Sequence, residues 1–261
     1  MLRTRVLSSV LMGAIILYPV WAGGLWFLAL AVTIGLLAGW EFYRLSEKNG
    51  YHPATATGLV CLTVLILSGY FPHQLRLEPL LTLLLMSSLI LALWGRGRKP
   101  ATDWAITIAG ALYLGMLLRF FPALREQSDG FDWLLYALLI TWITDSGAYF
   151  IGTAIGRHPL WPRLSPKKTW EGAIGGWIVG VVASAGLALF LTNMNWFQGL
   201  ILGAIVSLAA PFGDLAESMF KRQAGAKDSS HLIPGHGGAL DRIDSLLFVV
   251  PVVYYWANWL F

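Results

Sequence analysis

The sequence predicts an all-α fold, a polytopic transmembrane helical bundle with about nine spans. Hydrophobic residues make up 57% of the 261 positions and charged residues only 12%. The mean hydropathy is +0.65. Few charges and long apolar runs are typical of chains embedded in a bilayer, where a spanning helix needs about 20 apolar residues. These observations argue against a soluble domain.

Polar breaks cut the apolar sequence into nine candidate spans. They cover residues 6–22, 24–43, 54–71, 79–95, 104–122, 132–156, 170–192, 196–220 and 244–260. The first two are the hardest to separate, because one apolar stretch runs from Leu7 to Trp40. Pro19 and the pair Gly23-Gly24 predict a tight helix–turn–helix there.

The positions of the basic residues predict the topology. With a cytoplasmic N-terminus and nine spans, 15 of the 18 Lys and Arg residues fall on the cytoplasmic side and 3 on the other. This agrees with the positive-inside rule. We therefore expect a multi-pass protein of the cell (inner) membrane whose polar loops, residues 157–169 and 221–243, face the cytoplasm.

Polar residues concentrate in the C-terminal half of the chain. We divide the sequence into an N-terminal transmembrane scaffold, residues 1–130, and a C-terminal transmembrane catalytic region, residues 131–261, within one integral membrane unit. Small residues recur every four positions in the seventh span, a spacing that predicts close helix–helix packing. They are Gly172, Gly176, Gly180, Ser184 and Ala188.

Five acidic residues lie in or beside the later spans, where charges are costly and usually functional. Asp145 lies inside the sixth span, where a functional role and a structural ion pair are equally plausible. Asp214 and Glu217 are three residues apart and share a helix face, as do Asp241 and Asp244. Carboxylates brought together repel one another unless a cation binds between them, and oxygen ligands favour Mg²⁺ over zinc.

Basic residues flank these acids. They are Lys167, Lys168, Lys221, Arg222, Lys227 and Arg242. Carboxylates, a divalent metal and surrounding cations together suit a polyphosphate substrate. The segment from Pro234 to Gly238, with His236 at its centre, either brings backbone N–H groups to an anion or forms a plain turn.

The single cysteine, Cys61, excludes an intrachain disulfide and a cysteine-cluster metal site. A basic tail and RNA-binding signatures are missing from the sequence, so we expect no nucleic acid partner.

Several segments together resemble the phosphatidate cytidylyltransferases (CDP-diacylglycerol synthases). They are Ser165–Gly172, Gly213–Arg222, Lys227-Asp228, Pro234–Gly238 and Asp241–Asp244, with Asp145 beside Ala148-Tyr149. The sharp matches cover about residues 140–250, and the N-terminal third matches only in hydropathy. One departure is Ala239, which stands where the family usually has a bulkier aliphatic residue.

The resemblance implies transfer of CMP from CTP to phosphatidic acid, which gives CDP-diacylglycerol and pyrophosphate in phospholipid biosynthesis. It implies Asp214 and Asp241 as main Mg²⁺ ligands, with Glu217 and Asp244 as further ligands or orienting groups. It leaves open whether a monovalent cation such as K⁺ joins Mg²⁺, and it implies a homodimer. The implied catalytic groups are Asp214, Asp241, Asp244, Lys221 and Arg242. The implied substrate contacts are Ser165, Lys167, Lys168, Arg222, Lys227, His236, Gly237 and Gly238.

Two other functions fit parts of the pattern. A cytidylyltransferase acting on another lipid phosphate, such as an isoprenoid one, would use the same charged residues. A cation-coupled transporter would use Asp145, Asp214 and Glu217 as a relay. Transporter sites usually lie near the bilayer midplane, however, whereas most charges here gather at one face.

Overall fold

The computed structural model describes residues 16–94, 99–230, 232 and 237–260, and most of them are helical. The chain divides into two compact units. The first comprises Met1–Glu126 and Gln223–Arg242, and the second comprises Gln127–Arg222 and Ile243–Phe261. The described residues of Gln223–Arg242 thus belong to the same compact unit as the N-terminal helices.

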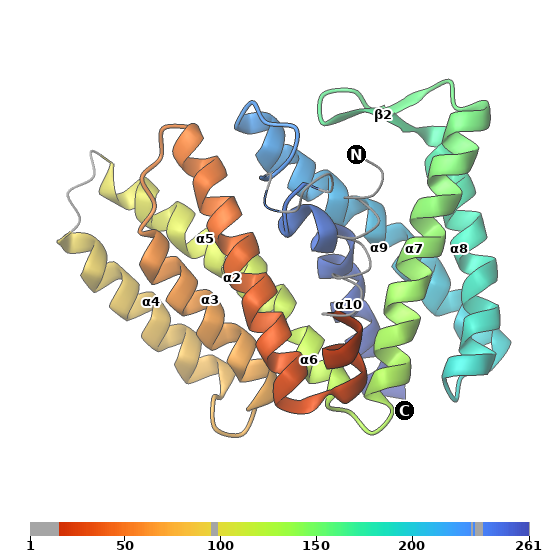
Figure 1. The fold of residues 1–261 in the computed structure, drawn as a ribbon, viewed down its shortest axis with the longest axis horizontal. Helices are drawn as coiled ribbons and strands as arrows, with labels where there is room; N and C mark the ends of the chain where they lie inside the picture. Colours follow the sequence, from red (N-terminus) through yellow and green to blue (C-terminus); the bar gives the residue numbers. More distant parts are fainter. Residues whose placement is uncertain (1–15, 95–98, 231, 233–236, 261) are drawn as a thin grey trace. The chain divides into compact units, whose positions relative to one another are not determined.

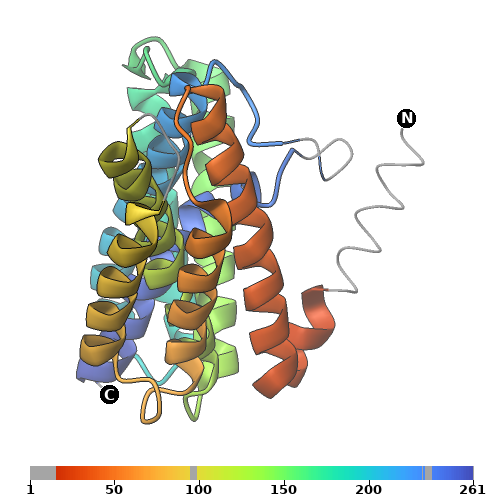
Figure 2. The same ribbon diagram turned by 90° about the vertical axis from the view of Figure 1, so that its left-hand side faces the viewer.

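The first unit contains helices of the N-terminal half of the chain. They are α2 (Gly24–Lys48), α3 (Thr55–Tyr70), α4 (Leu77–Leu93), α5 (Pro100–Leu118) and the short α6 (Phe120–Arg125). Helix α2 packs on α3 and α5, and α4 packs on α5 (Figures 1 and 2). Residues 16–22 are also helical, and Gly23 and Gly24 have φ values of +66° and +54°. The predicted helix–turn–helix is confirmed at its described end.

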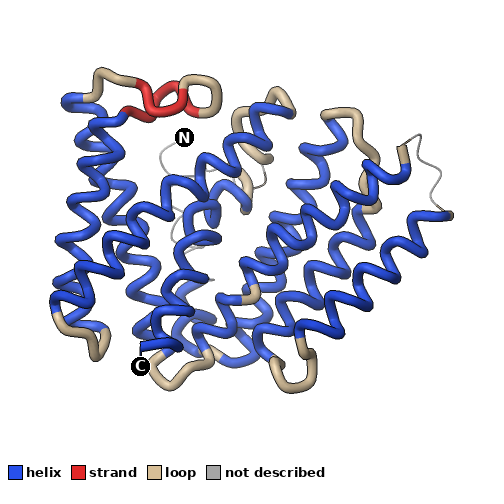
Figure 3. Tube along the Cα trace, turned by 180° about the vertical axis from the view of Figure 1, so that it is seen from behind, coloured by secondary structure: helices blue, strands red, loops and turns tan. Residues whose placement is uncertain are grey.

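The second unit contains three long helices and a hairpin. They are α7 (Gly130–Ile155), β1 (Pro159–Trp161), β2 (Ser165–Thr169), α8 (Trp170–Leu191) and α9 (Trp196–Gln223) up to Arg222. Helix α10 (Leu240–Leu260) begins in the first unit and continues in the second. The two antiparallel strands join α7 to α8 (Figure 3). This hairpin lies in the predicted polar loop, residues 157–169, where Pro159, Pro162 and Pro166 disfavour a continuous helix.

The predicted nine spans are not confirmed. Five stretches of the described chain are long and apolar enough to cross a bilayer: α2, Pro100–Arg125, α7, α8 and α9. Helices α3 and α4 have 16 and 17 residues, shorter than a bilayer normally requires. The charged first turn of α10 shortens its apolar part, and the prediction for residues 6–22 lies mostly outside the described residues. Several apolar helices nonetheless make the chain a multi-pass membrane protein.

The predicted packing stripe is confirmed in the second unit. All five of its small residues are buried on α8. A Cβ added to Gly176 would lie 2.6 Å from the Cβ of Ala148 and 2.8 Å from the carbonyl oxygen of Thr144. Helices α7 and α8 therefore approach almost backbone to backbone, which fixes the hairpin that joins them.

Candidate active site

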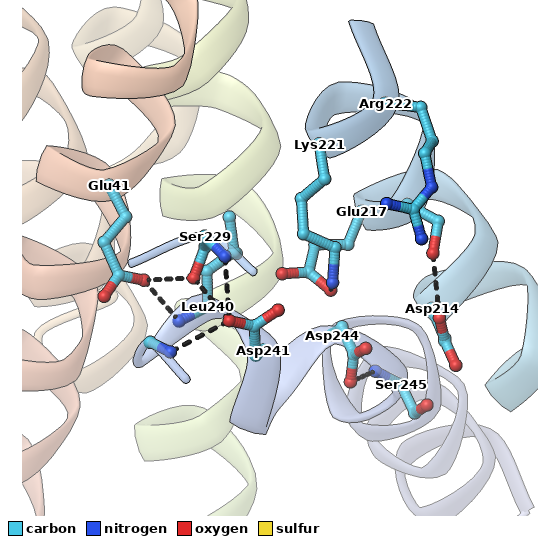
Figure 4. A network of polar contacts seen from close by, with 12 residues as sticks. Glu41, Asp214, Glu217, Lys221, Arg222, Ser229, Leu240, Asp241, Asp244 and Ser245 are labelled. Atoms are coloured by element: carbon cyan, nitrogen blue, oxygen red, sulfur yellow. Dashed lines mark hydrogen bonds and ion pairs between the residues drawn. The ribbon is translucent and has the colours of Figure 1, made fainter. Parts of the chain in front are cut away.

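Two acids of α9 lie on its last turns in the second unit. The Nζ of Lys221 donates to Glu217 Oε2 over 2.6 Å, one helical turn away, and the Glu217 side chain is fully buried. Asp214 accepts from the Ser218 hydroxyl at 3.2 Å and is about one-third exposed (Figure 4). Glu217 is thus enclosed with a cation of its own helix, whereas the Asp214 carboxylate is open to an incoming ligand.

The hairpin supplies the cation for Asp214. Lys168 Nζ lies 2.5 Å from Asp214 Oδ2. Arg222 Nε donates to the carbonyl of Leu164 over 3.0 Å, which ties the end of α9 to the same hairpin. Alternate side chains of a strand point to opposite faces, so Lys168 faces Asp214 while Lys167 is exposed. Of the two adjacent lysines predicted to bind substrate, only Lys168 contacts the acid.

Two further acids approach this group. The Asp244 carboxyl interacts with Glu217 and lies in the electrostatic field of Asp214 and Lys221. A Cβ added to Gly213 would meet the Asp244 carbonyl and lie 2.9 Å from Ser245 Cα, so this glycine permits α9 and α10 to approach. Asp145 of α7 interacts electrostatically with Lys168 and Asp214. The second unit therefore gathers Asp145, Asp214, Glu217 and Asp244 around two lysines.

Asp241 is bound by residues of the first unit. Its Oδ2 accepts from the Ser229 backbone N–H at 2.9 Å and the Gly238 N–H at 2.8 Å (Figure 4). The Ser229 hydroxyl oxygen lies 2.8 Å from the same Oδ2 and shares its single proton between Asp241 and Glu41. Gly237 has φ +80°, a backbone conformation that favours glycine. A Cβ on Gly238 would collide with Ser229 Oγ and the Glu41 carboxylate. The backbone conformation at Gly237 and the tight packing at Gly238 therefore each favour glycine, in addition to the predicted substrate contacts.

The other predicted substrate contacts lie near the surface or outside the described residues. Lys227 and Arg242 are exposed, and Ser165 is half-buried at the start of β2. His236 lies outside the described residues, so its predicted phosphate contact stays a prediction. The same holds for the roles assigned to the described basic residues.

The donor set suits Mg²⁺ in chemistry. Within the described part of the chain, no three carboxylate, imidazole or thiol groups are gathered closely enough to form a metal cage. Mg²⁺ at nucleotide sites usually needs only one or two carboxylates, because water and substrate phosphates complete its shell. Asp214, with Asp244 nearby, would meet that requirement if Lys168 were displaced.

Comparison with known proteins decides the family. The model of the Cytidylyltransferase family matches residues 3–260. The chain belongs to this family. It is 34% identical over 255 residues to the phosphatidate cytidylyltransferase of Staphylococcus aureus (strain COL), covering 97% of each chain. Similarity to the phosphatidate cytidylyltransferase of Staphylococcus haemolyticus (strain JCSC1435) is 33% over 258 residues, again with 97% of each chain covered.

Sequence analysis of this cytidylyltransferase found the acids of the C-terminal half but missed Glu41 of α2. Glu41 is fully buried and accepts hydrogen bonds from the segment that leads to Asp241. The available signal was an acidic residue inside the predicted span 24–43, since charges inside spans are costly. The family comparison extends over this N-terminal region, which had matched only in hydropathy.

Proposed function

We propose that the chain is a phosphatidate cytidylyltransferase, which transfers CMP from CTP to phosphatidic acid and releases pyrophosphate. The observation that carries the proposal is the similarity to phosphatidate cytidylyltransferases over 97% of both chains. The acid–lysine group at the end of α9 supports it, because nucleotidyl transfer depends on positioning and neutralising phosphates. Family membership disfavours the transporter alternative.

The reaction needs one bond to form and one to break. A phosphate oxygen of phosphatidic acid forms a bond to the α-phosphorus of CTP. The bond from that phosphorus to the oxygen bridging the α- and β-phosphates breaks, and its electron pair leaves with pyrophosphate. The attacking phosphate is already an oxyanion, so no strong general base is required. Catalysis then consists mainly of aligning the two phosphates and stabilising charge on the leaving group.

The charged and polar residues take the following roles in the proposal. Asp214 and Asp241 are the main Mg²⁺ ligands, as inferred from the sequence. Glu217 and Asp244 are further ligands or orient the main ones. Bound Mg²⁺ would supply charge neutralisation at the phosphate oxygens. Lys168 leaves Asp214 for a substrate phosphate. Lys221, Arg222 and Arg242 hold phosphates of CTP or lipid, with Ser165, Lys167, Lys227 and His236 as further contacts.

The membrane supplies the acceptor in this proposal. The acyl chains stay among lipid-facing helices, where apolar side chains such as Leu93 and Phe190 are more than four-fifths exposed. The charge distribution supports a cell-membrane location with the reacting phosphates on the cytoplasmic side, where CTP is found. A homodimer is proposed from the family resemblance, and mass measurement in detergent with bound detergent subtracted tests it.

A direct assay tests the proposal. Purified protein in mixed micelles receives labelled CTP, Mg²⁺ and either phosphatidic acid or an isoprenoid glycerol phosphate. We expect pyrophosphate and CDP-diacylglycerol in equal amounts with phosphatidic acid, and much less product with the isoprenoid acceptor. Preferential use of the isoprenoid phosphate would overturn the substrate assignment, and product formation unaffected by EDTA would overturn the Mg²⁺ assignment.

A further inference from the structure

Glu41 is a fully buried carboxylate inside α2. A buried carboxylate is costly unless hydrogen bonds replace its lost water. Its two oxygens accept four hydrogen bonds, all from residues about 190 positions later in the chain. Figure 4 shows two of them, from Ser229 and Leu240. Such a convergence of donors from a distant segment indicates that Glu41 organises that segment.

The four donors are shared equally between the two oxygens. Oε1 accepts from the Ser230 hydroxyl at 2.6 Å and the Ala239 N–H at 2.9 Å. Oε2 accepts from the Ser229 hydroxyl at 2.9 Å and the Leu240 N–H at 2.8 Å. A carboxylate has about four acceptor sites, so these donors account for its acceptor capacity. An amide could not replace it, because its NH₂ group would face two donors.

Two of these donors lie at the start of α10. The first N–H groups of a helix have no partner inside the helix and usually receive one from a capping side chain. Here the residue before the first helical position is Ala239, which has no polar side chain to provide a cap. Glu41 therefore caps α10 from a different helix, and its negative charge is favourable at a helix N-terminus.

The same hydrogen-bond network reaches Asp241. The hydroxyl oxygen of Ser229 lies 2.9 Å from Glu41 Oε2 and 2.8 Å from Asp241 Oδ2. The Gly238 N–H donates to Asp241, and the next two N–H groups donate to Glu41. The two carboxylates thus bind consecutive N–H groups of one short backbone segment. Displacement of either is therefore expected to shift the donors of the other.

We propose that Glu41 is a positioning residue that caps α10 and, through Ser229 and the backbone of residues 238–240, sets the orientation of Asp241. The inference rests on the proposed function, in which Asp241 is a metal ligand. Glu41 itself touches no substrate in this proposal. It fixes the Asp241 side chain so that less ordering is required when the metal and CTP bind.

A matched pair of substitutions in α2 tests the proposal. Glu41→Gln keeps the side-chain shape but removes two acceptor sites. Glu47→Gln is the control, because Glu47 lies on the same helix, is partly exposed and pairs with Arg44 at 3.3 Å. Glu41→Asp, which retains four acceptor sites on a shorter side chain, serves as the conservative variant and as a second test if Glu41→Gln does not fold.

Two readouts separate positioning from a general structural role. The first is amide hydrogen exchange of peptides covering residues 227–242 in the purified protein without substrate. The second is the Mg²⁺ concentration that gives half-maximal CMP transfer. Loss of an orienting partner typically weakens metal affinity or activity about 10- to 100-fold. We expect an effect in that range for Glu41→Gln, a smaller one for Glu41→Asp and wild-type behaviour for Glu47→Gln.

Amide hydrogen exchange and the Mg²⁺ requirement should change together in the Glu41 variants. We expect exchange in residues 227–242 to be about tenfold faster or more in Glu41→Gln, because local opening becomes easier, while peptides from α8 keep their protection. Unchanged exchange, or an unchanged Mg²⁺ requirement in a folded Glu41 variant, would overturn the proposal. Wild-type turnover in Asp241→Asn would overturn the claim that Glu41 acts by orienting Asp241 for the reaction. A wild-type protein that forms no CDP-diacylglycerol would overturn the proposed function instead.

Discussion

The two units of this cytidylyltransferase neutralise their acidic residues in different ways. In the second unit, Asp214 and Glu217 are paired with the side chains of Lys168 and Lys221. In the first unit, Glu41 and Asp241 are bound by backbone N–H groups and serine hydroxyls. A lysine side chain can rotate away and be replaced by another cation, whereas a backbone donor moves only with its segment. In the proposed mechanism, Asp214 exchanges its cation during the reaction, whereas Glu41 keeps its hydrogen-bond partners and holds the structure around them.

The largest effect is expected when the charge of Asp214 is removed. We expect Asp214→Asn to lower kcat/KM for CMP transfer by about 100- to 1000-fold, because charge stabilisation at a reacting phosphate is lost. The thermal unfolding temperature should change little, since Asp214 is partly exposed. Asp129→Asn is the control, because Asp129 is exposed and makes no side-chain cap at the start of α7. Normal turnover in Asp214→Asn would disprove the assignment.

The partner of Asp214 gives the next largest effect. Lys168→Met should lower kcat/KM by roughly 10- to 100-fold, as expected for a lost hydrogen bond to a charged group. Lys167→Met should have a smaller effect, since Lys167 is exposed and lies on the other face of the strand. Steady-state kinetics with varied CTP measure both variants. Equal losses at the two positions would show that hairpin orientation does not select Lys168.

The scaffold of the second unit is tested through its packing stripe. Gly176→Ala would place a methyl group against the backbone of α7, and we expect destabilisation of about 1–3 kcal/mol, as for other overpacked positions. Gly186→Ala on the same helix is the control, because nothing lies within 4 Å of its Cβ position. Thermal unfolding in detergent compares the two. Equal unfolding temperatures would mean that α7 and α8 do not require this close approach.

A smaller effect is expected at the bridging serine of the first unit. Ser229→Ala removes the hydroxyl between Glu41 and Asp241 but keeps the backbone N–H bond to Asp241. We expect a cost of about 1 kcal/mol, the usual contribution of one hydrogen bond, measured as a several-fold higher Mg²⁺ requirement. A loss as large as that of Asp214→Asn would contradict the distinction between the two regions.

The sequence alone was enough to predict the membrane class, the family and the acids of α9. Charges near the ends of apolar helices and the Gly172–Ala188 spacing are local patterns. Local patterns can be recognised in a sequence without knowledge of tertiary contacts. The hairpin was not predicted from the sequence, because its five-residue strand carries two lysines and a proline rather than an alternating apolar pattern.

The network around Glu41 could not be predicted from sequence. Its donors are separated from it by 188 to 199 positions in the sequence. Three of these donors belong to Ser229, Ala239 and Leu240, residue types that do not mark a functional site in a sequence. Two of those donors are backbone N–H groups, which have no signature of residue type. A single acidic residue in an apolar run marks a position to examine, but only the tertiary structure identifies what it binds.

The proposed exchange of Lys168 for a metal ion at Asp214 can be measured as cation binding. Mn²⁺ accepts the same octahedral oxygen ligands as Mg²⁺, and electron paramagnetic resonance reports its binding in the presence of CTP. We predict similar Mn²⁺ affinity in wild type and Asp129→Asn, and affinity at least about tenfold lower in Asp214→Asn. Unchanged Mn²⁺ affinity in Asp214→Asn would contradict the claim that this carboxylate exchanges Lys168 for a metal ion.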